Sequence, residues 1–72
     1  MTRKLLQYRG RYQLTMYCYA LGRKHNCEYV VSYGASRYDK KHATYRGQEL
    51  FVTDSVQAAI DDLKARVLRC GV

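Results

Sequence analysis

Proline and tryptophan are absent from the 72 residues, and every uninterrupted apolar stretch is short. A helix that crosses a bilayer needs about 20 apolar residues, so no segment qualifies. The N-terminal residues Met1–Gln7 also lack the apolar core of a signal peptide. Membrane-spanning and secreted classes are therefore disfavoured, and we expect a cytoplasmic protein, in a bacterial cell or in a host cell.

Acidic side chains are scarce: six Asp or Glu stand against thirteen Lys or Arg, a net charge of +7. The excess of basic residues is unevenly distributed along the sequence. Residues 1–47 hold ten basic and two acidic residues, net +8, whereas residues 48–72 hold three and four, net −1. A field concentrated on one part of a protein attracts polyanions and speeds their encounter. This charge pattern predicts a nucleic-acid partner for the first two thirds of the chain. Of the two nucleic acids we expect DNA rather than RNA.

Cysteine is rare and its count is odd, with Cys18, Cys27 and Cys70. A secreted disulfide framework normally uses an even number, so we expect free thiols that serve in packing. Cys18, His25 and Cys27 have some zinc-ligand character, with Cys70 or His42 as distant additions. They do not form the paired spacing of a zinc site, and we expect no metal and no other cofactor.

Signatures of catalysis are missing as well. The sequence has no P-loop and no dinucleotide-binding glycine pattern. Cys18 or Cys27 with His25 could form a nucleophile and base, but nothing in the sequence supplies a third, orienting group. A chain of this length builds one small core with little stability to spare. We therefore expect a single domain over residues 1–72 that binds a partner and is not an enzyme.

The C-terminal part predicts a helix from about Ser55 to Arg69. Its apolar residues recur at helical spacing, which makes one stripe. Asp54 with Gln57 fits a capping box at the start, and Gly71 is a typical stop. The stripe consists of Val56, Ala59, Ile60, Leu63 and Val67.

The first 52 residues have the alternation of strands. Residues 12–20 and 27–33 predict a hairpin joined by a polar turn over residues 21–26, and residues 34–41 predict a charged loop. A third strand is expected over residues 43–52, interrupted at Gly47, and a short extra strand at residues 4–8 is possible. The predicted class is α+β: an antiparallel sheet of three or four strands packed on one helix, in the order β-β-β-α.

Eight of the nine aromatic residues are tyrosine. In the first long strand Tyr17 and Tyr19 alternate with apolar positions, so we expect them on an open sheet face. Such a face with basic neighbours can stack bases and hold phosphates. It can equally contact a protein, or the tyrosines can simply be good strand formers. The residues expected on this face are Arg11, Gln13, Thr15, Tyr17 and Tyr19.

Basic clusters in the predicted loops add to that surface, because cations at sheet turns can contact a phosphate backbone. The complete set of candidate partner-binding residues is Arg9, Arg11, Gln13, Thr15, Tyr17, Tyr19, Arg23, Lys24, Arg37, Lys40, Lys41 and Arg46.

The segment Phe51–Asp61 is comparable to segments of known DNA-binding domains. In it an aromatic strand end is followed by Thr and Ser as a cap and then by an Ala-containing helix. With the three predicted strands it resembles the N-terminal DNA-binding domains of phage-type integrases. It is also similar to the DNA-binding domain of plant ethylene-response factors. Both families lay the sheet in the major groove. The resemblance implies base or phosphate contacts by Arg11, Gln13, Thr15, Tyr17 and Tyr19.

A different class is also open. A tiny domain without an enzyme signature looks like the small proteins that phages and mobile elements use against host systems, such as anti-CRISPR proteins. The open sheet face or an unpaired strand edge would then bind a host protein complex or a second copy of the chain. The basic charge argues against mimicry of DNA but is compatible with an acidic protein partner.

Overall fold

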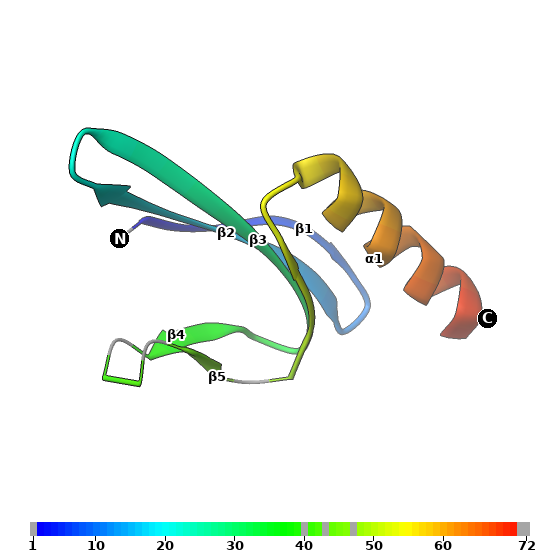
Figure 1. Cartoon of the computed structure of the whole chain (residues 1–72). Helices are drawn as coiled ribbons and strands as arrows, with labels where there is room; N and C mark the ends of the chain where they lie inside the picture. The colour runs from blue at the N-terminus through cyan, green and yellow to red at the C-terminus, as the bar shows by residue number, and fades with distance from the viewer. Residues whose placement is uncertain (1, 40, 43, 47, 71–72) are drawn as a thin grey trace.

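A computed structural model describes residues 2–39, 41–42, 44–46 and 48–70. The elements are β1 (Thr2–Arg9), β2 (Tyr12–Leu21), β3 (Lys24–Tyr33), β4 (Arg37–Asp39), β5 (Thr44–Arg46), β6 (Glu49–Thr53) and α1 (Val56–Cys70) (Figure 1). Antiparallel pairing joins four strands in the order β1-β2-β3-β6, and β4 pairs separately with β5. The predicted α+β class is confirmed, including the extra N-terminal strand.

Both long hairpins turn at a glycine. Arg9 pairs with Tyr12, and Leu21 pairs with Lys24, so each turn has two central residues. The first of them is Gly10 with φ 61° or Gly22 with φ 65°, the positive φ that tight hairpin turns require. The turn predicted over residues 21–26 is therefore too long, and β3 begins three residues earlier than expected.

The helix forms where its periodicity predicts it, and its N-cap lies within the predicted Thr53–Ser55 segment, but the predicted capping box of Asp54 with Gln57 does not form. Ser55 Oγ accepts a hydrogen bond from the Ala58 N–H at 3.2 Å, so Ser55 is the N-cap. Gln57 donates to Asp61 Oδ1 at 3.1 Å and forms no capping box with Asp54. The prediction of Gly71 as the helix stop lies outside the described residues.

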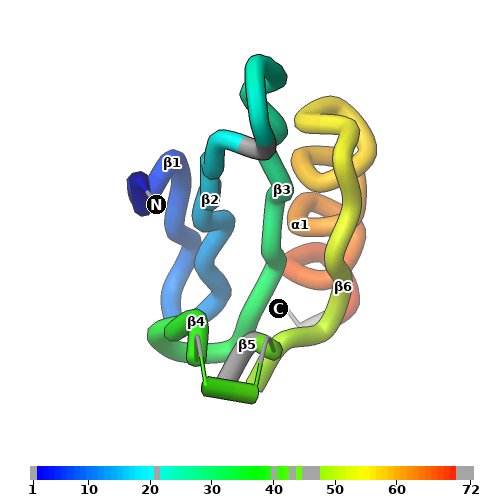
Figure 2. The backbone as a smooth tube through the Cα atoms, turned by 60° about the vertical axis from the view of Figure 1, so that its left-hand side comes forward, coloured from blue at the N-terminus to red at the C-terminus, as the bar shows by residue number. Residues whose placement is uncertain are grey.

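One face of the sheet packs on α1. Leu14 on β2 and its partner Val31 on β3 lie against Ala59 and Leu63 of the helix, and all four are buried. The helix contacts β2, β3 and β6, and Figure 2 shows it beside β3 and β6, away from β1. The predicted stripe therefore covers this face, with Val56 at its start left 41% exposed.

Between β3 and β6 the chain makes an excursion, residues 34–48, which we call the arm. The Gly34 N–H donates to Arg11 O at 2.7 Å where the arm leaves the sheet, and the Tyr33 N–H donates to Gln48 O at 2.9 Å where it returns. The predicted charged loop thus contains a strand, β4. The predicted third strand divides into β5 and β6; Ala43 and Gly47 lie outside the described residues.

The arm covers the centre of the second sheet face. The buried residues there are Thr15, Tyr17, Val30 and Ser32, together with Ser36 of the arm. The prediction that this face is open is therefore wrong at its centre. Alternation along a strand separates two faces, but it does not say whether a later segment covers one of them.

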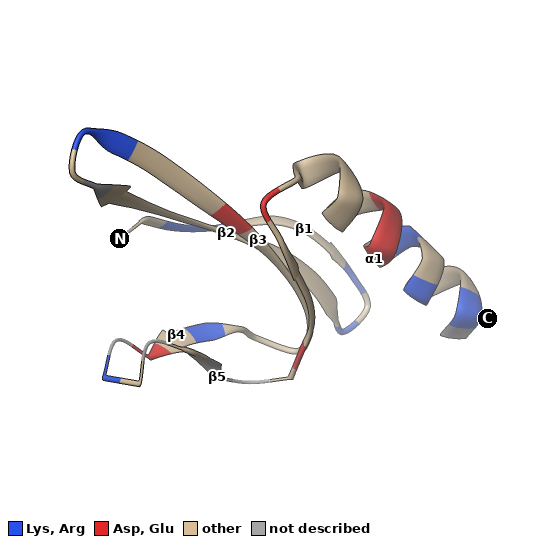
Figure 3. Cartoon of the chain, viewed as in Figure 1, with Lys and Arg blue, Asp and Glu red and all other residues tan. Residues whose placement is uncertain are grey.

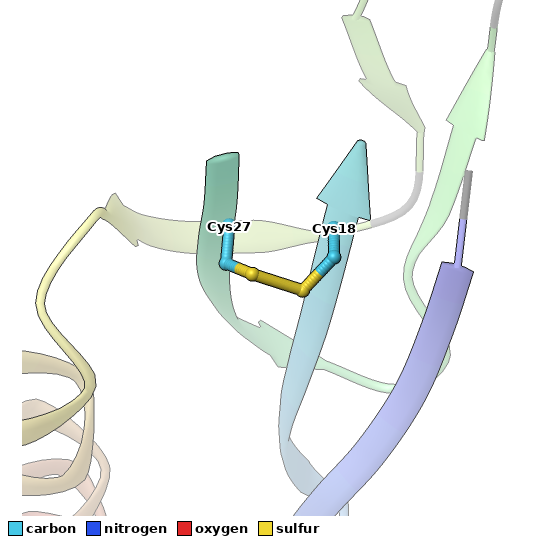
Figure 4. Close-up of a disulfide and its surroundings, with 2 residues drawn as sticks. All are labelled: Cys18 and Cys27. Carbon is cyan, nitrogen blue, oxygen red and sulfur yellow. A yellow bond between two sulfur atoms is a disulfide. The ribbon is translucent and has the colours of Figure 1, made fainter. Parts of the chain in front are cut away.

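Cys18 and Cys27 occupy one cross-strand pair of β2 and β3 and form a disulfide, with Cα atoms 4.1 Å apart (Figure 4). The prediction of free thiols is wrong for these two residues, because the hairpin register places them opposite each other. No helix among the described residues is long and apolar enough to cross a membrane.

Candidate nucleic-acid interface

Three segments distant in sequence lie on the same side of the molecule in Figure 1: the start of β1, the β2–β3 turn and the tip of the arm. They are spread along that side, with the β2–β3 turn at the top, the start of β1 in the middle and the arm at the bottom (Figures 1 and 2). The β1–β2 turn and the helix C-terminus lie at the opposite end (Figure 1). Blue basic segments lie on the β2–β3 turn and on the arm (Figure 3). We call four exposed cations of these segments the basic rim: Arg3, Arg23, Lys24 and Lys41. Lys4 is also exposed but pairs with Met16 and lies on the other sheet face.

The strand register places two members of the basic rim on the same sheet face as the arm. Arg3 pairs with Tyr17, whose side chain contacts the arm. Lys24 shares its side of β3 with Glu28, the cross-strand partner of Tyr17. Arg23 is the second residue of the hairpin turn. The sheet therefore positions cations on both sides of the surface beside the arm.

Tyrosines line the surface between these cations. Tyr17 and Tyr38 have ring centroids 6.4 Å apart at 48°, so the arm strand β4 turns Tyr38 toward the sheet. Tyr19 donates a hydrogen bond from its hydroxyl to Glu28 Oε1 at 3.3 Å. Tyr19 and Tyr38 are half-buried, whereas Tyr17 is buried. Two of the three rings thus keep surface for an incoming group.

The Tyr19 phenol has a raised pKa. The negative charge of Glu28 is the main cause, followed by burial, the hydrogen bond to Glu28 and the nearby Tyr38. The neutral phenol is favoured because its ionised form would lie beside a carboxylate. Tyr19 is uncharged at neutral pH, as an ordinary tyrosine is, and the hydrogen bond to Glu28 holds its hydroxyl.

The arm tip is held by Asp39. Its Oδ1 accepts from the Lys41 backbone N–H at 3.0 Å, and its Oδ2 lies 2.7 Å from His42 Nδ1. These contacts form a side-chain-bonded turn that presents the exposed Lys41. Arg37 alternates with Tyr38 along β4, so it lies on the outer side of the arm, away from the sheet.

The structure separates the other predicted binding residues. Arg9 and Arg11 flank Gly10 at the end opposite the basic rim (Figure 1). Thr15 and Tyr17 are buried, and Gln13 is half-buried. The predictions for Lys40 and for the Arg46 side chain lie outside the described residues.

Arg3, a member of the basic rim, is absent from the candidate residues predicted from the sequence. The predicted extra strand starts at Lys4, two residues after the observed start of β1 at Thr2. Only the pairing of Arg3 with Tyr17 relates Arg3 to the tyrosine face. A longer first strand alone would not have given that signal, because a regular extension of the β1–β2 hairpin from Gly10 pairs Arg3 with Cys18 on the other face. The irregularity between Leu5 and Gln7 shifts the register by one residue and pairs Arg3 with Tyr17.

Within the described parts of the chain no three His, Cys, Asp or Glu side chains come together in a metal-binding group. Cys18 and Cys27, two of the zinc ligands considered, are joined to each other. No protein-family model, curated protein or solved structure matches the chain. The resemblance to integrase and ethylene-response-factor domains therefore stays a prediction.

Proposed function

We propose that the protein binds a nucleic-acid backbone, DNA first, on the surface bounded by the basic rim. The observation that carries the proposal is the register that places Arg3 and Lys24 on one sheet face, with Arg23 at the β2–β3 turn and Lys41 at the tip of the arm on the same side of the molecule (Figure 1). Cations supplied by separate, rigid elements can contact phosphates on both sides of a strand.

The tyrosines give the surface a second means of contact. A half-buried ring such as Tyr19 or Tyr38 presents apolar area to a sugar or an unpaired base at a small cost in conformational entropy. Because Glu28 holds the Tyr19 hydroxyl, the ring orientation is set before a ligand arrives. The proposal differs from the sheet-in-groove mode of the resembled families, since the arm covers the centre of that face.

Salt-dependent anisotropy with labelled duplex DNA, single-stranded DNA and RNA tests the proposal. Four phosphate contacts predict a slope of log K against log salt of about −3 to −4. The double variant Arg3→Gln with Lys24→Gln should reduce the slope by about two and the affinity by about tenfold or more.

The matched control is Arg9→Gln with Arg11→Gln, which removes the same charge from the opposite end. It should change the affinity much less. If both double variants weaken binding equally, the affinity depends on the net charge of the protein and not on the position of the basic rim. If no duplex or single strand binds at low salt and micromolar protein, the proposal fails.

Location is part of the same proposal. The sequence favours the cytoplasm, whereas a disulfide such as Cys18–Cys27 is typical of an oxidising compartment. We propose the cytoplasm, with this bond formed only when the compartment becomes oxidising. Thiol labelling of acid-quenched cells should find both cysteines reduced in unstressed cells; a bond already complete there would contradict this.

A further inference from the structure

We propose that the outer edge of β1 and the groove beside it bind an extended, acidic segment of another protein. β1 is the terminal strand of the sheet, and within the described residues it pairs only with β2. Its eight residues, with an irregularity between Leu5 and Gln7, therefore present main-chain donors and acceptors on the side away from β2. Such an edge is a template for an added strand.

A groove lies between the end of β1 and the last turns of α1. Its volume is about 320 Å³, and its lining is Gln7, Arg9, Leu63, Lys64, Val67 and Leu68. A second hollow of about 240 Å³ follows the strand itself, over Leu6 to Arg9. The two share Gln7 and Arg9, so the free edge and the apolar groove form one continuous surface.

The groove exists because α1 packs on β2, β3 and β6, which leaves the end of β1 uncovered. Leu68 is 83% exposed there, although burying such a side chain is favourable. A partner that inserts apolar side chains beside Leu68 and Val67 would remove that surface from water. Added strands supply side chains at alternate positions on the groove side.

Charge decides the kind of partner. Arg9 and Lys64 lie in the groove lining, which contains no acid, and Arg3 and Lys4 lie further along β1. A second copy of the chain would bring the cations of two β1 strands together, and like charges at a pairing edge oppose association. A nucleic acid would offer no aliphatic groups to the Leu and Val lining. An acidic segment with leucine-like side chains satisfies both features.

A labelled peptide of alternating leucine and threonine, with glutamates at both ends, is a suitable probe. The leucines would occupy the groove side, and the glutamates would meet the cations of β1 and α1. Anisotropy should show binding that is lost when serine replaces leucine and when lysine replaces glutamate. Absence of binding at millimolar peptide would overturn the proposal.

Leu68→Glu should weaken peptide binding by about tenfold or more. The fold should persist, because the side chain is exposed. Val56→Glu, a substitution at the other end of the same helix at a side chain that is 41% exposed, is the matched control and should leave the affinity unchanged. Equal effects of the two variants would contradict a site in the groove.

Amide NMR and sedimentation complete the test. Peptide binding should slow hydrogen exchange at outward-facing amides of β1 and shift residues 63–68, with no change at the β2–β3 turn. The free protein should sediment as a monomer; a dimer that Leu68→Glu dissociates would assign this edge to a second copy instead. DNA binding should be unaffected by Leu68→Glu, so failure of this proposal and failure of the nucleic-acid proposal are separate outcomes.

Discussion

The Tyr17 hydroxyl donates a hydrogen bond to Ser36 Oγ at 3.0 Å, and both residues are buried. Nineteen positions separate them in the sequence. This contact fixes the start of β4 over the centre of the sheet. It therefore decides that the surface beside the arm, and not the middle of the sheet, is free to meet a partner.

Removing the hydroxyl should loosen the arm. Tyr17→Phe leaves Ser36 without this donor in a buried position, so the free energy of unfolding should fall by about 1 kcal/mol. Urea denaturation of Tyr17→Phe, Ser36→Ala and the double variant measures the coupling between the two groups. Tyr8→Phe, at a 68% exposed side chain, is the control and should have almost no effect. An additive double variant would show that the hydrogen bond contributes nothing.

Replacement of Thr15 should make the folded protein more stable. Its Oγ1 is buried and has no hydrogen-bond partner among the described residues, so the hydroxyl was desolvated without compensation. Thr15→Val replaces it by a methyl group of similar shape and should raise the free energy of unfolding by about 1–2 kcal/mol. Thr44→Val on the exposed surface of β5 should change it by less than about 0.5 kcal/mol. A destabilised Thr15→Val protein would mean that the hydroxyl has a partner.

The Cys18–Cys27 bond should matter most for the tip of the β2–β3 hairpin. It closes a loop with a sequence separation of 9, for which chain entropy predicts roughly 2–3 kcal/mol of stabilisation. Reduction, or Cys18→Ser with Cys27→Ser, should therefore speed hydrogen exchange over residues 19–26 and weaken nucleic-acid binding through Arg23 and Lys24. Cys70→Ser retains the bond and should change neither property. Unchanged exchange after reduction would contradict this role.

The raised pKa of Tyr19 gives a pH dependence with a defined sign. Glu28 and burial favour the neutral phenol in the folded protein. The stabilisation is therefore complete below the ordinary tyrosine pKa of about 10. It is lost as the pH rises through the higher pKa of the folded state.

Titration of ¹³C-labelled tyrosine by NMR measures this directly. Glu28→Gln removes the main charge and should bring the Tyr19 pKa down toward its ordinary value. Glu49→Gln, which removes an exposed carboxylate from β6, should leave it raised. A Tyr19 pKa that is the same in Glu28→Gln and in the native protein would assign the shift to burial alone.

The sequence predicts those elements in which a regular apolar pattern continues over many consecutive residues. The helix with its apolar stripe has 15 residues, about four turns, and the alternating strand β2 has ten residues, so both elements follow from periodicity. The strands of the arm have three residues each, which is too short for a period. Only the distant contacts of Tyr17 with Ser36 and Tyr38 identify their place.

The disulfide could be predicted only if the β2–β3 turn was placed at the right residues. Cys18 and Cys27 are equally far from the centre of a Gly22–Arg23 turn, so a two-residue hairpin places them opposite each other. With a turn predicted over residues 21–26, the first strand ends too early and the second begins too late. The pairing of Cys18 with Cys27 is then not apparent. The odd number of cysteines then favoured free thiols. The half-buried Tyr19 and the buried Tyr17 likewise share one face, and the arm residue Ser36 is hydrogen-bonded to Tyr17.

The hydrogen bond from the Tyr33 N–H to Gln48 O means that the arm begins and ends at neighbouring points. The sheet can therefore keep its strand order while residues between those points change in length or composition, as with insertions at other loops whose ends meet. Variation in the arm would alter the charge and shape of the binding surface without a change of register. The four-stranded sheet and its helix would then stay the same while the arm changes.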